Sequence, residues 1–188
     1  AAIARDTRSA AALEPCGSDG FWKCVGEQAG DAWTALGGDA SWNKVLLGFA
    51  DPRTSAVGAL TLGSAAASYF GSTGFGSTEI DSDDTFFTWF SGIAKSVPND
   101  ALDDPIALLL QRPSAVGIAA GTAQHYTALA GSRTDQFPAT YPGPMATADV
   151  VVTVRDGSDV PAIVVSDLTQ SLRSDGWTEP SGEANGLP

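Results

Sequence analysis

The chain has 188 residues, of which 43% are hydrophobic and 17% charged, a composition typical of globular proteins and not of disordered ones. Its formal net charge of −12 at pH 7 argues against nucleic acid or an anionic membrane as a partner. No run of 18 or more apolar residues is present, so the sequence predicts no transmembrane span, and it shows no signal peptide.

The first 30 residues contain both cysteines of the chain. Residues 1–18 are rich in alanine and predict irregular structure, and a short helix is expected within 19–30. Cys16 and Cys24 lack the further cysteines and histidines of a zinc site, since His125 is the only histidine. A short-range disulfide, and with it an extracytoplasmic compartment, is favoured over two unrelated thiols in a cytosolic protein.

A strand, a turn and a helix start follow one another in the segment 45–58. The apolar run 45–50 has the length of a buried strand, and Asp51-Pro52 ends it because proline cannot continue a central ladder. Thr54 and Ser55 are residues that open helices, and residues 56–70 suit a helix packed on a sheet. In open α/β sheets ligands bind at the carboxyl ends of strands. The alternative is that these hydroxyls only cap the helix.

A second unit of the same kind is predicted further along the chain. Helices are expected from Ser82 or Asp83 to about Val97, and from Pro105 to near Arg112. Residues 115–120 then predict a buried strand, and 121–124 a turn into a helix that ends at 131. Thr122 stands where Thr54 and Ser55 stand in the first unit. Two such turns in a parallel sheet lie on one edge and would form a polar or anionic ligand site.

The remaining residues predict short strands at 137–141 and 148–154, a helix at 160–173 and a disordered tail at 179–188. Strands and helices therefore alternate through most of the chain. The predicted fold is a doubly wound α/β domain with a mostly parallel sheet, helices on both faces and an antiparallel strand or two near its end.

The segment Leu47-Gly-Phe-Ala-Asp-Pro-Arg-Thr-Ser-Ala-Val-Gly58 resembles the start of the second lobe in type 2 periplasmic or extracellular solute-binding proteins, the receptors of ABC importers. The resemblance continues in order through 33–42, 115–124, 137–142 and 148–154. It implies a solute-binding-protein-like domain over residues 31–178, with an N-terminal extension over 1–30.

Strand-end position and this resemblance together give the candidate ligand-binding residues. Hydroxyls and N–H groups at Thr54, Ser55 and Thr122 would bind the solute, and Arg53 would be a countercharge for an anionic group. Asp51 and Gln124 would orient their neighbours, and Tyr141 would form a wall. No cofactor or metal is expected.

The resemblance covers one lobe of a receptor that has two. Only 50 residues precede Asp51, too few for a first lobe. The chain is therefore either a fragment of a larger extracytoplasmic protein or a one-lobe relative. Its expected partners are a small polar or anionic solute and either a membrane transporter or the missing lobe.

Two other classes of function stay open. A scaffold or protein-interaction module of the cell envelope would have lost solute binding. A hydrolase is less favoured, because the sequence has no Gly-x-Ser-x-Gly elbow, no Cys/His pair, no zinc signature and no dinucleotide fingerprint. His125, predicted beside the second turn, is the one histidine that could reach the cleft. The sequence thus predicts a non-catalytic binding domain.

Overall fold

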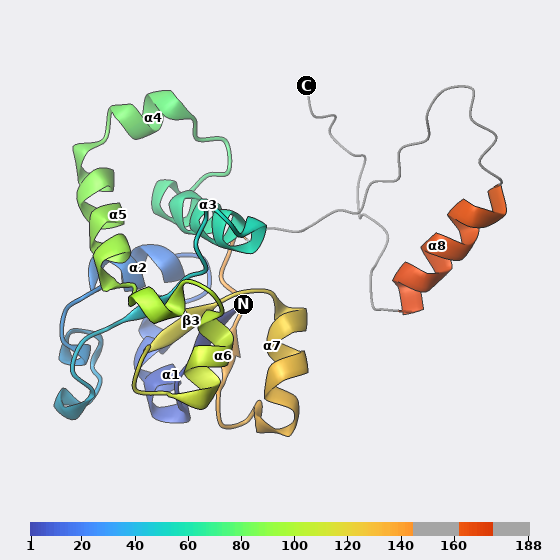
Figure 1. Cartoon of the computed structure of the whole chain (residues 1–188). Coiled ribbons are helices and arrows are strands. Elements are labelled where there is room, and N and C mark those ends of the chain that lie inside the picture. Colours follow the sequence, from blue (N-terminus) through green and yellow to red (C-terminus); the bar gives the residue numbers. More distant parts are fainter. Residues whose placement is uncertain (145–161, 175–188) are drawn as a thin grey trace. The chain divides into compact units, whose positions relative to one another are not determined.

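A computed structural model describes residues 1–144 and 162–174 of the chain. Its contacts divide the chain between residues 146 and 147, so the two parts are described separately (Figure 1). The predicted strand at 148–154 and the predicted tail at 179–188 lie outside the described residues. None of the helices that are described is long and apolar enough to span a membrane.

The first part is an α/β unit built on one four-stranded sheet with the order β2-β3-β1-β4. Strands β2 and β3 are parallel, with Leu47 opposite Ile118, whereas β1 is antiparallel to both of its neighbours. The strands are β1 (Ala2–Ala4), β2 (Leu47–Gly48), β3 (Ile118–Ala120) and β4 (Ala139–Thr140).

The sheet is mixed, which corrects the predicted mostly parallel arrangement. Among the described strands one pairing is parallel and two are antiparallel, because β1 inserts between β3 and β4 in the opposite direction. The expectation of irregular structure over residues 1–18 is also wrong, because they contain β1 and a helix at Thr7–Leu13. Three residues with two alanines carry little strand signal in the sequence, and burial between neighbouring strands decides their conformation. Strand β1 therefore belongs to the same sheet as the strands beyond residue 30.

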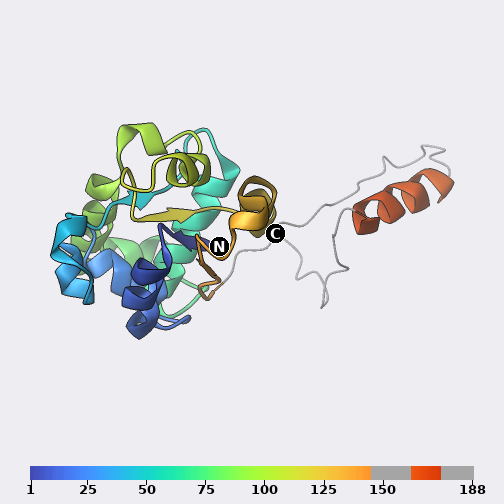
Figure 2. The same ribbon diagram turned by 90° about the horizontal axis from the view of Figure 1, so that it is seen from below.

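Helices cover both faces of the sheet, as the sequence predicts. Side chains alternate along β1, so Ala2 and Ala4 enter one hydrophobic core and Ile3 enters the other. The first core also takes side chains of α1, α2, α3 and α5, and the second takes those of α6 and α7. The ribbons of helices on both sides of the strands are seen in Figure 2. The helices are α1 (Thr7–Leu13), α2 (Phe21–Glu27), α3 (Ala56–Phe70), α4 (Ser77–Asp81), α5 (Asp84–Ser96), α6 (Pro105–Gln111) and α7 (Ala123–Ala130).

The predicted helix starts are confirmed by their caps. Ser55 caps α3, Asp83 caps α5 and Thr122 caps α7, each through a side-chain oxygen that accepts a backbone N–H. Proline is the first residue of α6, as expected where the backbone needs no N–H donor. Local sequence therefore fixes where these helices begin.

The predicted disulfide is present. Cys16 and Cys24 are joined with their Cα atoms 5.5 Å apart, and the bond links the segment after α1 to helix α2. Trp22 of α2 lies in the first core, where its ring is 5.2 Å from that of Phe49. The cross-link therefore holds α2 close to the chain that precedes it, on one face of the sheet.

The second part of the chain is described by one helix, α8 (Ala162–Ser174). The sequence leaves a choice between strand and helix here, and the four-residue spacing of Val164, Leu168 and Leu172 favours a helix. That prediction is confirmed for residues 162–173.

Candidate functional site

The two predicted turns lie on the same edge of the sheet. Strands β2 and β3 are parallel neighbours, so their carboxyl ends point the same way, and each is followed by a turn and a helix. Ser55 Oγ accepts the N–H of Gly58 at 3.2 Å, and Thr122 Oγ1 accepts that of His125 at 3.1 Å. Each hydroxyl is thereby fixed at the N-terminus of its helix.

A hollow of about 200 Å³ lies between these helix starts. It brings Ser55 and Thr122 together, as the parallel arrangement predicts. Helix α6 starts at the same place, where Asp104 Oδ1 accepts the N–H of Ala107 at 3.0 Å. The lining consists of the polar residues Ser55, Asp103, Asp104, Thr122 and His125, together with Ala50, Val57, Pro105, Ile106, Ala120 and Gly121.

His125 and Asp104 form a pair in this lining that sequence reasoning missed. His125 Nε2 lies 2.9 Å from Asp104 Oδ2, and both side chains are partly exposed. The bond ties α7 to α6. The sequence marks Asp104 as a helix cap and His125 as a residue beside the second turn, but it contains no signal that the two helices meet.

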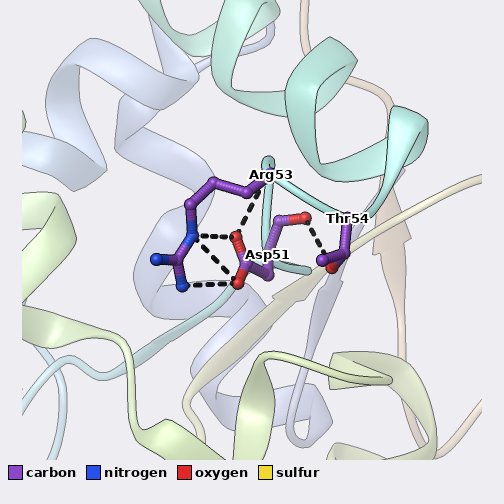
Figure 3. A network of polar contacts seen from close by, with 3 residues as sticks. All are labelled: Asp51, Arg53 and Thr54. Carbon is purple, nitrogen blue, oxygen red and sulfur yellow. Dashed lines mark hydrogen bonds and ion pairs between the residues drawn. The ribbon is translucent and has the colours of Figure 1, made fainter.

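Asp51, Arg53 and Thr54 form a contact network of their own beside α3 (Figure 3). Arg53 Nη2 donates to Asp51 Oδ2 at 2.7 Å and Arg53 Nε to Asp51 Oδ1 at 3.0 Å. The Thr54 N–H donates to the Asp51 carbonyl at 3.1 Å. None of the three lines the hollow, and the Arg53 side chain is 82% exposed. The structure thus places the predicted countercharge in an ion pair, and its role toward a solute stays a prediction.

The Asp51–Arg53 pair has a testable pH dependence. Hydrogen bonds from the Arg53 side chain and backbone lower the pKa of Asp51 to about 2. A lowered pKa stabilises the fold above the unfolded-state value of about 4, and this contribution is lost as the pH falls towards 2. We expect Asp51→Asn to lower the urea midpoint at pH 5 and to have little effect at pH 2. A difference in urea midpoint between variant and wild type that stays the same from pH 5 to pH 2 would contradict the lowered pKa of Asp51.

The last two predicted residues also lie outside the lining of the hollow. Gln124 is exposed on the first turn of α7, next to His125. Tyr141 follows β4 and is half exposed. Of the seven predicted residues, Ser55 and Thr122 line the hollow, and the roles of the other five toward a solute stay predictions.

Charge in the hollow is predominantly negative. Asp103 and Asp104 contribute carboxylates, and the imidazole of His125 is the only basic group of the lining. Helix N-termini add partial positive charge from three directions. Within residues 1–144 and 162–174, no three His, Cys, Asp or Glu side chains are grouped to hold a metal ion. The arrangement offers both donors and acceptors for hydrogen bonds to a polar molecule.

Gly58 allows the first turn of α3 to approach the strand end. A Cβ atom on Gly58 would meet the Ala50 carbonyl oxygen and would lie 2.8 Å from its carbon. Ala50 lines the hollow, so this approach sets the distance between α3 and the end of β2. Gly58 is the last residue of the segment 47–58, and this close contact is the physical reason why a glycine stands there.

No protein-family model matches the chain, and neither a curated protein nor a solved structure shows significant similarity to it. The assignment of a function therefore depends on the geometry of the hollow.

Proposed function

We propose that the chain contains an extracytoplasmic solute-binding domain, similar to the second lobe of type 2 solute-binding proteins, that holds a small polar solute in the hollow at the start of α3, α6 and α7. The observation that supports this most is the meeting of Ser55 and Thr122. Their hydroxyls come from turns after two parallel strands and line one hollow. That the fold is a doubly wound lobe of this type is also proposed here.

The polar groups of the hollow favour a solute with both donors and acceptors. Ser55 and Thr122 accept helix N–H groups, so their own O–H groups are available to donate to a solute. Asp103 adds a carboxylate acceptor to the lining. A neutral or zwitterionic solute fits this set better than an anion, which the two carboxylates would repel.

The wider setting follows from the same proposal. A disulfide is typical of oxidising compartments, which supports an extracytoplasmic location. A membrane transporter or a first lobe supplied by another part of a larger protein would be the partner. The His125–Asp104 pair is a tie between helices in this proposal, and the domain is non-catalytic.

A thermal-shift screen of the chain against amino acids, sugars, oxyanions and metal ions tests the proposal. A solute at a hundred times its dissociation constant adds about 2.7 kcal/mol of stability, which is readily measured. We expect a polar neutral or zwitterionic solute to raise the melting temperature. Lack of any shift at millimolar concentrations would favour the scaffold or protein-interaction alternative.

The double variant Ser55→Asn/Thr122→Asn locates the site. Asparagine is as good an N-cap as serine, so the free energy of unfolding should change by less than about 1 kcal/mol. Each hydroxyl is replaced by a larger amide, whose donors lie elsewhere and which narrows the hollow, so the affinity for the solute should fall at least tenfold. The matched control is Thr54→Asn, one residue from Ser55 but outside the lining, which should bind as wild type does. Equal affinity in the double variant and the control would exclude this hollow as the site.

A further inference from the structure

Two arginines share one indole ring at a corner of the first unit, although the chain as a whole is strongly acidic. The guanidinium carbon of Arg5 lies 4.8 Å from the centre of the Trp42 ring, and that of Arg8 lies 5.3 Å from it. Arg5 stands between β1 and α1, and Arg8 lies in the first turn of α1. Like charges held this close repel one another, and the nearby carboxylates of Asp6 and Asp39 offset part of that repulsion.

The donors of these arginines exceed the acceptors around them. The Arg5 side chain is only 12% exposed, and its nearest carboxylate oxygen, Asp6 Oδ2, is 3.7 Å from Nε, too far for a hydrogen bond. Within the described residues neither guanidinium donates a hydrogen bond. Asp6 accepts the N–H of Ser9 at 2.7 Å, and Asp39, the other carboxylate near both arginines, accepts that of Ser41 at 2.8 Å.

A buried donor without an acceptor lies beside Arg5. Trp33 is fully buried, and its indole N–H has no hydrogen-bond partner among the described residues. The ring edge that carries this nitrogen packs against Gly117, whose carbonyl accepts the backbone N–H of Arg5 at 3.1 Å. The guanidinium carbon of Arg5 lies 5.8 Å from the centre of the Trp33 ring. Buried polar groups in native proteins are normally hydrogen-bonded, so this unpaired donor is an exception in the packing beside Arg5.

We propose that the Arg5–Arg8 corner, formed by Arg5, Arg8, Trp33 and Trp42, is a second ligand site that binds a small oxyanion such as phosphate or sulfate. Guanidinium groups donate paired hydrogen bonds to the oxygens of such anions. An oxyanion between Arg5 and Arg8 would accept hydrogen bonds from both guanidinium groups and would offset the repulsion between them that remains. The corner shares no residue with the hollow at Ser55 and Thr122, so this inference is independent of the proposed function.

Titration of the full chain with sodium phosphate and sodium sulfate, followed by tryptophan fluorescence, tests the proposal. Sodium chloride at equal ionic strength is the reference, because it screens charges without offering paired oxygens. We expect a saturable change in emission with the oxyanions and not with chloride. Arg8→Gln should weaken oxyanion binding at least tenfold, whereas Arg112→Gln, which removes an exposed arginine paired with Asp100, should leave it unchanged.

Arg8 is the decisive position because it is exposed, so its replacement leaves the fold intact even if replacement of the partly buried Arg5 does not. The same response to chloride, the absence of saturable binding, or equal affinity in Arg8→Gln and wild type would each overturn the proposal. The variant Ser55→Asn/Thr122→Asn should bind the oxyanion as wild type does. Loss of binding in that variant would show that the anion enters the hollow, and this result would also overturn the proposal of a second site.

Discussion

Replacing Gly58 with alanine is expected to destabilise the fold by about 2–3 kcal/mol, because overpacking at a rigid contact has costs of this order. The added methyl group would overlap the carbonyl of Ala50, and the carbonyl carbon of Asp51 is 3.2 Å away. Both neighbours are backbone, so neither can turn aside as a side chain would. Urea unfolding of the variant measures the loss directly.

Gly63 gives the matched control in the same helix. A Cβ atom there would meet nothing within 4 Å, and the residue is exposed. Gly63→Ala should therefore show the ordinary helix propensity and stabilise the protein by about 1 kcal/mol. The two substitutions are chemically the same, but their effects on the free energy of unfolding are expected to have opposite signs. A gain in stability for Gly58→Ala would show that α3 does not approach the end of β2 as described.

Replacing Ile3 with alanine should destabilise the protein by about 3 kcal/mol, in the range found for buried aliphatic side chains. Ile3 has 0% of its surface exposed and lies in the second core together with Leu109 and Tyr126. It also lies in β1, the strand that pairs with β3 on one side and with β4 on the other. Loss of its side chain leaves a cavity beside a central strand, where the surrounding backbone has little freedom to close it.

Two comparisons make the Ile3 prediction specific. Ile3→Val removes one methylene group and should have an effect of about 1 kcal/mol. Leu60→Ala removes as many carbon atoms as Ile3→Ala, but from the surface of α3, where Leu60 is 43% exposed. It should change stability by less than about 0.5 kcal/mol if exposure governs the effect. An Ile3→Ala effect no greater than that of Leu60→Ala would mean that residues 2–4 form no part of the sheet core.

Local sequence predicted the elements that carry their own signals. Helix α3 begins after Ser55 and ends at Phe70, as expected from its hydroxyl cap and from the composition of residues 56–70. Gly71, which follows the helix, adopts a left-handed conformation. The same holds for the starts of α5, α6 and α7. A cap or a first-turn proline acts on backbone groups within four residues, so neighbouring residues suffice to determine it. The Cys16–Cys24 bond was predictable for the same reason, since the two cysteines are close in sequence.

The sequence predicted part of the lining of the hollow. Two strand-turn-helix units with hydroxyls at their caps were visible in the sequence, and parallel pairing of β2 with β3 was enough to bring Ser55 and Thr122 together. Arg53, by contrast, turns back on Asp51, two residues away. A short-range ion pair of this kind competes with any role toward a ligand, and strand-end position does not reveal it.

The sequence by itself determined the α/β class, the starts and ends of the main helices, the disulfide and the two turns at one edge of the sheet. Tertiary structure alone decided the place of Ala2–Ala4 at the centre of the sheet, the meeting of Asp104 with His125 and the stacking of two arginines on Trp42. The physical reason is range. Capping and turn chemistry act between residues a few positions apart, whereas strand order and contacts between helices depend on burial shared by residues more than twenty positions apart, which no local pattern encodes.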